Sequence, residues 1–474
     1  MYQAYIGLEI HIQLLTKSKV FCSCRAQFGD EPNTNVCPVC MGYPGVLPAL
    51  NEEAVRMGYV VARALNCTLS RRTVFARKNY FYPDMPKNYQ ISQYDDPIGR
   101  DGYIDIEIGG RIKRVRVHEV HLEEDAGKMI HVGDASLCDD NRAGTPLLEI
   151  VTEPDMESGE EAEALIQEFR RMVRYLGVCD GNMEEGSLRC DANVSVNEAG
   201  KGLGTKVEIK NLNSSRFVRL ALDHEIERQK ALLEEGRQVV QETRLWNENR
   251  DVTESMRTKE SAHDYRYFPE PDLPPFVPDE AFFAQVEASL VELPLARKQR
   301  FLSDYGISVQ QADFLIEEKA RADFFEEAVR RGVAPSTAAA WLAGDVAKLL
   351  NRYRVELDAS PLTMDRFVLL MELLQKGEIH GRIAKQVLSA VFEEDKDPSR
   401  IIEEKGWRQL SEEELVKVVD EVITAHPKAV EQVKGGEEKP VGFLMGQVMA
   451  RTAGRAHPEK TREVLLSRIR GGEG

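Results

Sequence analysis

Four cysteines near the N-terminus are spaced as two close pairs. Cys22 and Cys24 form a C-x-C pair, Cys37 and Cys40 form a C-x₂-C pair, and 12 residues separate the two pairs. Two such turns can point four sulfurs at one centre, which is the arrangement that Zn²⁺ takes in structural zinc ribbons. Because protein would fill all four ligand positions, the pattern predicts a closed structural zinc site. Buried or redox-active cysteines are the alternative interpretation.

A second set of chemically capable residues lies on a predicted strand at residues 5–14. Apolar residues alternate there with polar ones, so Glu9 and His11 share one face, about 6 to 7 Å apart. For an isolated strand, a solvated polar face is the commoner explanation of this pattern. Further acids in similar strand contexts favour a site: Glu149 interrupts the apolar run 147–151, and 121–125 reads HLEED. A buried acid is costly unless it is paired or bound to a cation.

One histidine and several carboxylates are hard ligands that suit Mg²⁺ and, through it, nucleotide phosphates. Alternation leaves open whether Glu123 or Glu124 points with the others, because a bulge near His118 would exchange them.

Cations and aromatic residues are interleaved between residues 77 and 89, where Lys78 and Lys87 lie among tyrosines. Such a segment can hold phosphates and stack a ring, or it can be a packed tyrosine-rich loop. Arg189 and Asp191 share the polar face of another predicted strand, at 187–194, for which an internal salt bridge is the alternative.

The elements that would position these residues change character along the chain. Short strand-like runs dominate up to about residue 150. Ser158 and Glu161 then predict the start of a helix, and strands resume at 187–196 and 205–210. The segment 268–278 contains five prolines and reads as a boundary, after which helical patterns dominate.

Composition excludes several classes of protein. The 474 residues are 42% hydrophobic and 30% charged, which is typical of a globular protein and not of a disordered or fibrous one. No signal peptide or membrane-length apolar run is visible, and the remaining cysteines (Cys67, Cys138, Cys179 and Cys190) have no paired spacing, so a reducing, cytoplasmic location is expected. The net charge of −17 argues against general coating of nucleic acid. Residues 1–292 hold 34 basic and 49 acidic residues, a net charge of −15.

Long ordered segments of this sequence resemble the B-subunit family of the tRNA-dependent amidotransferases (GatCAB). The segments are 5–11 (YIGLEIH), 77–84 (RKNYFYPD), 87–93 (KNYQISQ), 121–128 (HLEEDAGK), 141–150 (NRAGTPLLEI), 184–193 (EEGSLRCDAN) and 264–272 (DYRYFPEPD). Residues 440–449 (PVGFLMGQVM) resemble the tail domain of that family, so the likeness covers nearly the whole chain.

The resemblance implies a ligase activity in protein biosynthesis. Members of this family use ATP to phosphorylate the side-chain carboxylate of glutamate on tRNA(Gln) or aspartate on tRNA(Asn). Ammonia then displaces the phosphate and gives the amide. The partners it implies are a glutaminase A subunit that supplies ammonia through a channel, a small C subunit, the mischarged tRNA and a transient aminoacyl-tRNA synthetase complex. A zinc-bearing RNA-binding module without catalysis is the alternative function.

The resemblance also implies roles for particular residues. Mg²⁺ would be held by Glu9, His11, Glu124 and Glu149, and zinc by Cys22, Cys24, Cys37 and Cys40. The residues around the reaction chamber, which would neutralise phosphate or shape the ammonia route, would be Lys78, Lys87, Arg189 and Asp191. The implied fold class is α+β, with a sheet-rich cradle catalytic domain at 1–292, an all-helical domain at 293–400 and a helical, tRNA-binding tail at 401–474.

Overall fold

A computed structural model describes residues 1–258, 265–408, 410–452 and 454–471. Asp264, the first residue of the 264–272 segment, lies outside these ranges. The chain divides into two compact units, Met1–Arg297 and Lys298–Gly474. Among the described helices none has the length and apolar character needed to cross a membrane.

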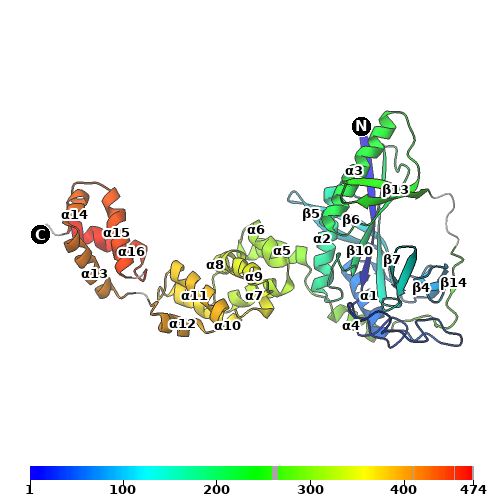
Figure 1. Ribbon diagram of the computed structural model, residues 1–474, viewed down its shortest axis with the longest axis horizontal. Helices are drawn as coiled ribbons and strands as arrows, with labels where there is room; N and C mark the ends of the chain where they lie inside the picture. Colours follow the sequence, from blue (N-terminus) through cyan, green and yellow to red (C-terminus); the bar gives the residue numbers. More distant parts are fainter. Residues whose placement is uncertain (259–264, 409, 453, 472–474) are drawn as a thin grey trace. The chain divides into compact units, whose positions relative to one another are not determined.

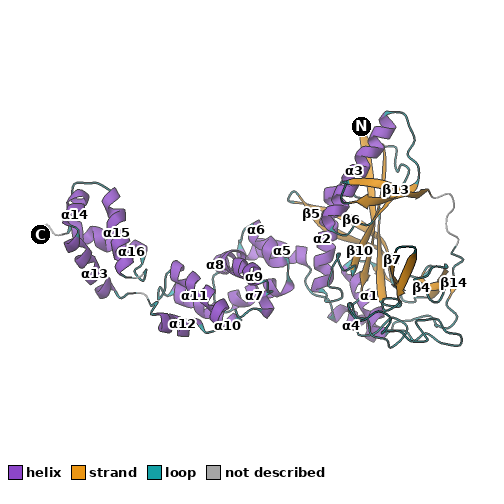
Figure 2. Cartoon of the chain, in the orientation of Figure 1, coloured by secondary structure: helices purple, strands orange, loops and turns teal. Residues whose placement is uncertain are grey.

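The first unit is built on a nine-stranded sheet (Figures 1 and 2) with the strand order β13-β12-β11-β10-β1-β9-β6-β5-β2. Neighbouring strands are antiparallel except for the parallel pair β11 and β12. The strands are β1 (Tyr2–Gln13), β2 (Thr68–Leu69), β5 (Gly99–Ile108), β6 (Arg111–Glu124), β9 (Pro146–Thr152), β10 (Leu188–Glu198), β11 (Val207–Lys210), β12 (Glu242–Asn247) and β13 (Val252–Thr258).

The core lies on one face of this sheet. On β1 the side chains of Ile6, Leu8, Ile10 and Ile12 are buried, as the alternating pattern predicts. Helices α1 (Glu52–Ala64), α2 (Gly159–Tyr175) and α3 (Ser215–Glu234) cover that face, and α2 lies beside α3 (Figure 1). Each helix buries its apolar face against the sheet. The candidate site therefore lies on the opposite, polar face of the sheet.

Ser158 caps α2 as the sequence predicts, because its hydroxyl accepts the backbone N–H of Glu161. The Glu161 carboxylate accepts the backbone N–H of Glu157 at 2.7 Å, one residue before the position that a capping box would use. This helix therefore starts at its predicted place with a slightly different set of bonds.

Two small sheets and one more helix complete the first unit. The order β14-β3-β4 joins β14 (Phe268–Pro269), β3 (Phe75–Asn79) and β4 (Tyr89–Gln93), and a separate hairpin joins β7 (Lys128–Val132) and β8 (Ala135–Asp139). Strand β4 contacts β6, and helix α4 (Glu280–Ala288) packs on α1. The small three-stranded sheet brings the lysine and tyrosine segment to the end of β6.

The second unit consists of helices in its described residues. They are α5 (Pro294–Tyr305, which begins in the first unit), α6 (Val309–Ile316), α7 (Lys319–Arg330), α8 (Pro335–Trp341), α9 (Ala347–Tyr353), α10 (Met364–Gln375), α11 (Gly381–Glu394), α12 (Pro398–Lys405), α13 (Glu412–Ala425), α14 (Pro427–Lys434), α15 (Lys439–Arg451) and α16 (Pro458–Arg470). A π-helical turn (Leu342–Val346) joins α8 to α9, and a 3₁₀ turn (Leu357–Ala359) follows α9. The buried apolar residues form two separate clusters, one within 301–402 and one within 415–469.

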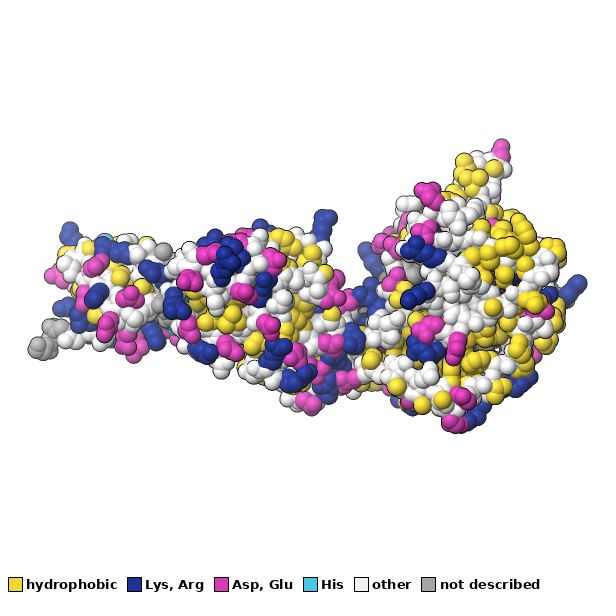
Figure 3. Space-filling view, turned by 90° about the horizontal axis from the view of Figure 1, so that it is seen from below, with side chains coloured by type: hydrophobic (Ala, Val, Ile, Leu, Met, Phe, Trp, Pro, Cys, Tyr) yellow, Lys and Arg dark blue, Asp and Glu magenta, His cyan; other side chains and the backbone are white. Residues whose placement is uncertain are grey.

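The expectation of an α+β fold, with a sheet-rich part followed by helices, is confirmed. Figure 3 shows basic and acidic side chains interspersed over the helical unit on the face in view. This mixture agrees with the nearly balanced charge of residues 293–474, which hold 28 basic and 30 acidic side chains.

Candidate functional site

A row of four polar residues crosses the polar face of the sheet. His11 on β1 lies opposite Arg189 on β10 and opposite Glu149 on β9, and Glu149 lies opposite His121 on β6. Directly opposed residues have Cβ atoms about 4.5 to 5.5 Å apart and point to the same side. Residues far apart in the sequence therefore meet because β1 is inserted between β9 and β10.

Two carboxylates and one imidazole of this region could hold a cation. The Nε2 atom of His11 lies 3.5 Å from Oε2 of Glu149 and 4.0 Å from Oε1 of Glu123. One ligand atom from each of the three residues lies within 4.8 Å of the others. Carboxylate and imidazole ligands in such a cluster fit Mg²⁺ by their chemistry.

Strand β6 decides which glutamate joins this cluster. Its pairing with β9 shifts register between Val117 and Glu119, so the residues beyond the irregularity exchange faces. As a result Glu123 points toward His11, whereas Glu124 forms an ion pair with Lys87 and accepts the backbone N–H of Ile91 at 2.8 Å. The structure thus places Glu123, and not Glu124 as expected, beside His11 and Glu149.

His121 adds a second imidazole that the sequence reasoning did not assign. Its Nε2 lies 2.9 Å from Oε2 of Glu149, and its Nδ1 is buried without a hydrogen-bond partner. Burial alone would lower the pKa of His121. The charge and hydrogen bond of Glu149, together with the charges of Glu123 and Glu119, outweigh burial and raise that pKa to about 9. His121 has the same strand parity as Glu123, which is the signal that could have found it.

The pKa values of the two glutamates of the cluster are shifted in opposite directions. Burial would raise the pKa of Glu149, but the charges and hydrogen bonds of His121 and His11 hold it well below the usual value. Burial and the negative charge of Glu149 raise the pKa of Glu123. A bound divalent cation would reverse that second effect, because its positive charge favours the ionised carboxylate.

Glu9, two residues before His11 on β1, belongs to a different acidic group. It is grouped with Asp191 and Glu208, and Asn193 donates to its Oε1 at 2.7 Å. Lys210 on β11 lies among these acids, with its Nζ 2.7 Å from Asp191 and 3.2 Å from Glu208. The structure therefore separates Glu9 from His11 and Glu149 and gives Asp191 a lysine partner.

Arg189 is also engaged by a carboxylate. It donates to Oδ1 of Asp125 at 3.0 Å, while Gln13 donates to Oδ2 at 2.7 Å. Burial would raise the pKa of Asp125, but Arg189 and Arg142 outweigh it and lower that pKa. Asp125 carries a negative charge at neutral pH for this reason, and the internal salt bridge that the sequence left open for Arg189 is present.

Lys78 faces an aromatic wall beside the cluster. Its Nζ lies 5.1 Å from the ring centroid of Tyr265, and its charge offsets part of the rise in the pKa of Glu123. The wall continues through ring contacts that join four tyrosines in the order Tyr80, Tyr265, Tyr267 and Tyr94. Tyr94 and Tyr267 stack with centroids 4.1 Å apart. Tyr265 and Tyr267 come from a distant segment, which the sequence alone does not bring here.

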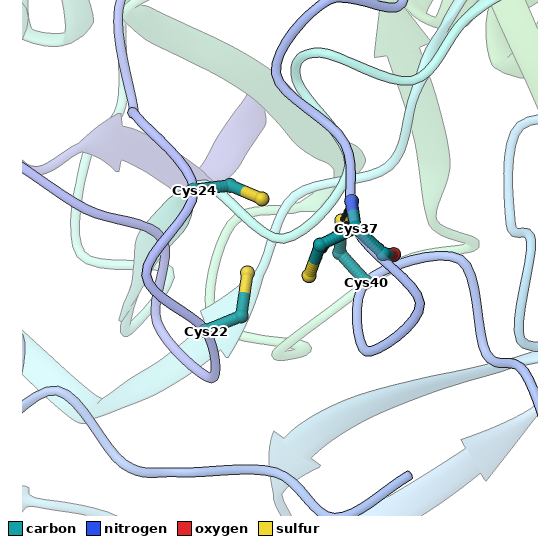
Figure 4. A group of neighbouring side chains, drawn as sticks. All are labelled: Cys22, Cys24, Cys37 and Cys40. Atoms are coloured by element: carbon teal, nitrogen blue, oxygen red, sulfur yellow. Dashed lines mark hydrogen bonds between the residues drawn. The ribbon is translucent and has the colours of Figure 1, made fainter.

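The four paired cysteines converge on one point (Figure 4). One sulfur from each of Cys22, Cys24, Cys37 and Cys40 lies within 4.8 Å of the other three, and the sulfurs of Cys37 and Cys40 are 3.9 Å apart. Tetrahedral zinc, with bonds of about 2.3 Å, needs sulfurs about 3.8 Å apart. The set therefore fits zinc in ligand type, number and spacing.

The remaining cysteines stay apart from this cluster. Cys67, Cys179 and Cys190 are buried, and Cys138 is half-buried on β8. Burial raises the pKa of Cys67 and of Cys179 to about 12, so both are uncharged thiols at neutral pH.

Comparisons with known proteins agree along the whole chain. The family described as "GatB/GatE catalytic domain" matches residues 4–284, and the one described as "GatB domain" matches residues 323–469. This chain is also similar to proteins named as the B subunit of aspartyl/glutamyl-tRNA(Asn/Gln) amidotransferase. The one from Carboxydothermus hydrogenoformans is 49% identical over 99% of both chains. The one from Geobacter sulfurreducens is 48% identical over 99% of this chain and 100% of its own. With these matches over nearly its full length, the chain belongs to the GatB/GatE family.

Proposed function

We propose that this chain is the B subunit of an aspartyl/glutamyl-tRNA amidotransferase and carries its ATP-dependent amidation site. The observation that carries the proposal is the row His11, Glu149 and His121, with Glu123 beside it, on the polar face of the sheet in a chain whose relatives bear that name. Such a cluster of carboxylates and imidazoles suits a metal-assisted phosphoryl transfer.

The proposed reaction has two steps. The side-chain carboxylate of glutamate on tRNA(Gln), or of aspartate on tRNA(Asn), attacks the γ-phosphorus of ATP, and ADP leaves. Ammonia then attacks the carbonyl carbon of the acyl phosphate, and phosphate leaves with the bonding electrons. Phosphorylation is needed because a carboxylate oxygen is a poor leaving group, whereas phosphate is a good one.

His11, Glu123 and Glu149 would hold Mg²⁺ in this scheme. The metal would supply positive charge that neutralises the transferred phosphate. His121 would orient Glu149 through its 2.9 Å contact. Glu9 lies in the adjacent acidic group and would act at the border of the site rather than beside His11.

The cationic residues near the cluster would hold or guide the reactants. Lys78 lies beside the ring of Tyr265, and Lys87 forms an ion pair with Glu124, outside the cluster of His11, Glu123 and Glu149. Arg189 and Asp191 would shape the chamber through Asp125 and Lys210. The four-cysteine cluster would hold a structural zinc ion.

The partners would be a glutaminase A subunit, a small C subunit, the mischarged tRNA and, transiently, an aminoacyl-tRNA synthetase, all in the cytoplasm where translation occurs. We also propose that residues 1–292, 293–400 and 401–474 are three domains, with the last one binding tRNA. The separate apolar clusters within 301–402 and 415–469 support that division.

The test is reconstitution with A and C subunits, glutamine, Mg²⁺, ATP and Glu-tRNA(Gln) or Asp-tRNA(Asn). We expect amide formation coupled to ADP release, and loss of both in Glu149→Gln. Glu160→Gln, an exposed acid on α2, is the matched control and keeps full activity. Binding of tRNA without ATP-dependent amidation would instead favour a zinc-bearing RNA-binding module.

A further inference from the structure

The cysteine knuckle, which we define as residues 22–42, contacts Lys87 through a glycine. Gly42 has a φ of +68°, and a Cβ atom built there would lie 2.7 Å from Cγ and 2.9 Å from Cα of Lys87. Its N–H donates to the carbonyl of Val39, and the N–H of Met41 donates to that of Cys37, both at 3.0 Å. The turn that holds the second cysteine pair therefore ends directly on the backbone of Lys87, at a position where a side chain does not fit.

The side chain of Lys87 extends from this contact toward Glu124, at the edge of the candidate site. Its side chain is 8% exposed and forms an ion pair with Glu124, whose side chain is 3% exposed. The Lys87 ammonium also lies 5.4 Å from the ring centroid of Tyr89 and 5.7 Å from that of Phe21. Because rings and a carboxylate enclose this ammonium, a shift of the Lys87 backbone would move it relative to Glu124.

A second connection runs through Lys19, which is fully buried. Its Nζ lies 3.6 Å from Sγ of Cys40 and donates to the carbonyl of Asp140 at 3.1 Å. A Cβ atom built on Gly144 would lie 3.3 Å from Cδ of Lys19 and 3.8 Å from Oε2 of Glu124. The Lys19 side chain, whose ammonium lies beside Cys40, and the carboxylate of Glu124 thus both lie next to Gly144.

The space between the knuckle and the ion pair is small. A cavity of about 20 Å³ is lined by residues of both, including Lys19, Cys22, Cys40, Lys87 and Glu124. That volume accommodates about one water molecule. Two of the knuckle cysteines and both members of the ion pair therefore border the same small cavity.

We propose that the knuckle is a positioning element for the Lys87–Glu124 ion pair, and that metal in the knuckle and closure of this pair are linked. Gly42 sets the place of the Lys87 backbone, and Lys19 ties the charge of Cys40 to the surroundings of Glu124. A change in the knuckle then reaches the ion pair without altering any residue of the metal cluster at His11.

The first arm of the test compares two glycine variants of the full chain. Gly42→Ala places a Cβ against Lys87, whereas Gly45→Ala introduces a Cβ at a similar positive φ of +87° with nothing within 4 Å. Labelling of lysines by an amine-reactive acetylating reagent, read by mass spectrometry, reports how accessible Lys87 is. We expect Lys87 to label about tenfold faster in Gly42→Ala than in the parent protein, through easier local opening. Zinc content and the labelling of Lys113 and Lys210 stay unchanged in that variant.

The second arm removes zinc from the unmodified chain with a chelator. Lys87 is expected to label faster in the zinc-free protein and to return to its slow rate when zinc alone is added back. This arm remains informative where Gly42→Ala does not fold. It rests on the zinc assignment proposed above, whereas the glycine arm does not.

Unchanged labelling of Lys87 in Gly42→Ala that retains zinc would overturn the proposal. So would equal acceleration at Lys87, Lys113 and Lys210 after zinc removal, since the knuckle would then only support the fold. Metal analysis that finds no zinc in the purified protein would overturn the zinc assignment and the proposed link between metal and the ion pair. The comparison of Gly42→Ala with Gly45→Ala would still decide whether the turn positions Lys87.

Discussion

Glu123 and Glu124 are neighbours on β6, yet their carboxylates face opposite sides of the strand and have different partners. Glu123 lies 4.0 Å from Nε2 of His11, and Glu124 pairs with Lys87 and accepts the N–H of Ile91. Two chemically identical side chains therefore have different surroundings, one beside His11 and one beside a buried lysine.

Substituting Glu123 should weaken cation binding, whereas substituting Glu124 should lower the stability of the fold. Glu123→Gln removes a cation ligand, so we expect Mn²⁺, used as a probe for Mg²⁺, to bind about tenfold more weakly or worse. Glu124→Gln should leave Mn²⁺ affinity unchanged and lower the free energy of unfolding by about 2–4 kcal/mol, because Lys87 keeps its charge without a charged partner. Calorimetric titration and urea unfolding measure the two effects. Equal weakening of Mn²⁺ binding by both variants would contradict the assignment of Glu123.

Loss of one knuckle cysteine should remove the metal and destabilise the first unit. For Cys40→Ser we expect loss of zinc and a melting temperature lower by about 5–10 °C, since metal binding contributes to folding. Cys138→Ser, on the hairpin strand β8, is the control and keeps both values. Elemental analysis and thermal unfolding are the measurements. A Cys40→Ser protein that retains a full zinc complement would show that the four sulfurs are not the ligands.

Arg189 should stabilise the fold mainly by neutralising the buried carboxylate of Asp125. Arg189→Met leaves Asp125, a 3% exposed residue, with Gln13, the backbone N–H of Ala126 and the more distant Arg142, 3.6 Å away. We expect a loss of about 2–4 kcal/mol in unfolding free energy, the cost of a buried charge without its main partner. The double variant with Asp125→Asn should recover part of this loss in urea unfolding. Additive losses in the double variant would show that the two side chains are not coupled.

The ion pair beside the register shift of β6 should make stability depend on pH in acid. Hydrogen bonds from Arg116, at 2.6 and 2.9 Å, lower the pKa of Asp155. Because the folded pKa is depressed, this contribution is present above the unfolded value of about 3.9 and is lost as pH falls through the folded value. We expect Asp155→Asn to melt about 1–2 °C lower than the parent at pH 7, and this difference to shrink as pH falls below the ordinary carboxyl pKa of about 3.9 toward the depressed pKa of Asp155. A difference that persists in acid would mean that the effect is not electrostatic.

Much of the site was predictable because strand alternation is a local property. The pattern of residues 5–14 indicated that Glu9 and His11 share the polar face, and the apolar run around Glu149 indicated a buried acid. The pairwise spacing of the cysteines likewise needs only the short turns that hold each pair. These features depend on residues within a few positions of each other.

The features that could not be predicted depend on pairing between distant segments. The irregularity between Val117 and Glu119 arises where β6 meets β9, and it alone decides between Glu123 and Glu124. Glu9 shares β1 with His11, but its neighbour on β10, Asp191, forms an ion pair with Lys210 on β11, the strand that pairs with β10. Glu9 therefore belongs to a different group from His11. No local pattern in either segment reports these tertiary contacts.

The central position of β1 has a consequence for synthesis on the ribosome. Strand β1 is translated before the strands that pair with it, β9 and β10, which are encoded more than 130 residues later. At about 5–20 residues per second, the wait until β10 has been translated lasts roughly 10–40 s. Until β9 has been made, the apolar side chains of Ile6, Leu8, Ile10 and Ile12 lack both neighbouring strands, and the covering helices α2 and α3 are translated later still. The nascent chain therefore depends on shielding of strand β1, and chaperone-depleted translation should lower the yield of this protein more than that of a chain whose sheet is completed in sequence order.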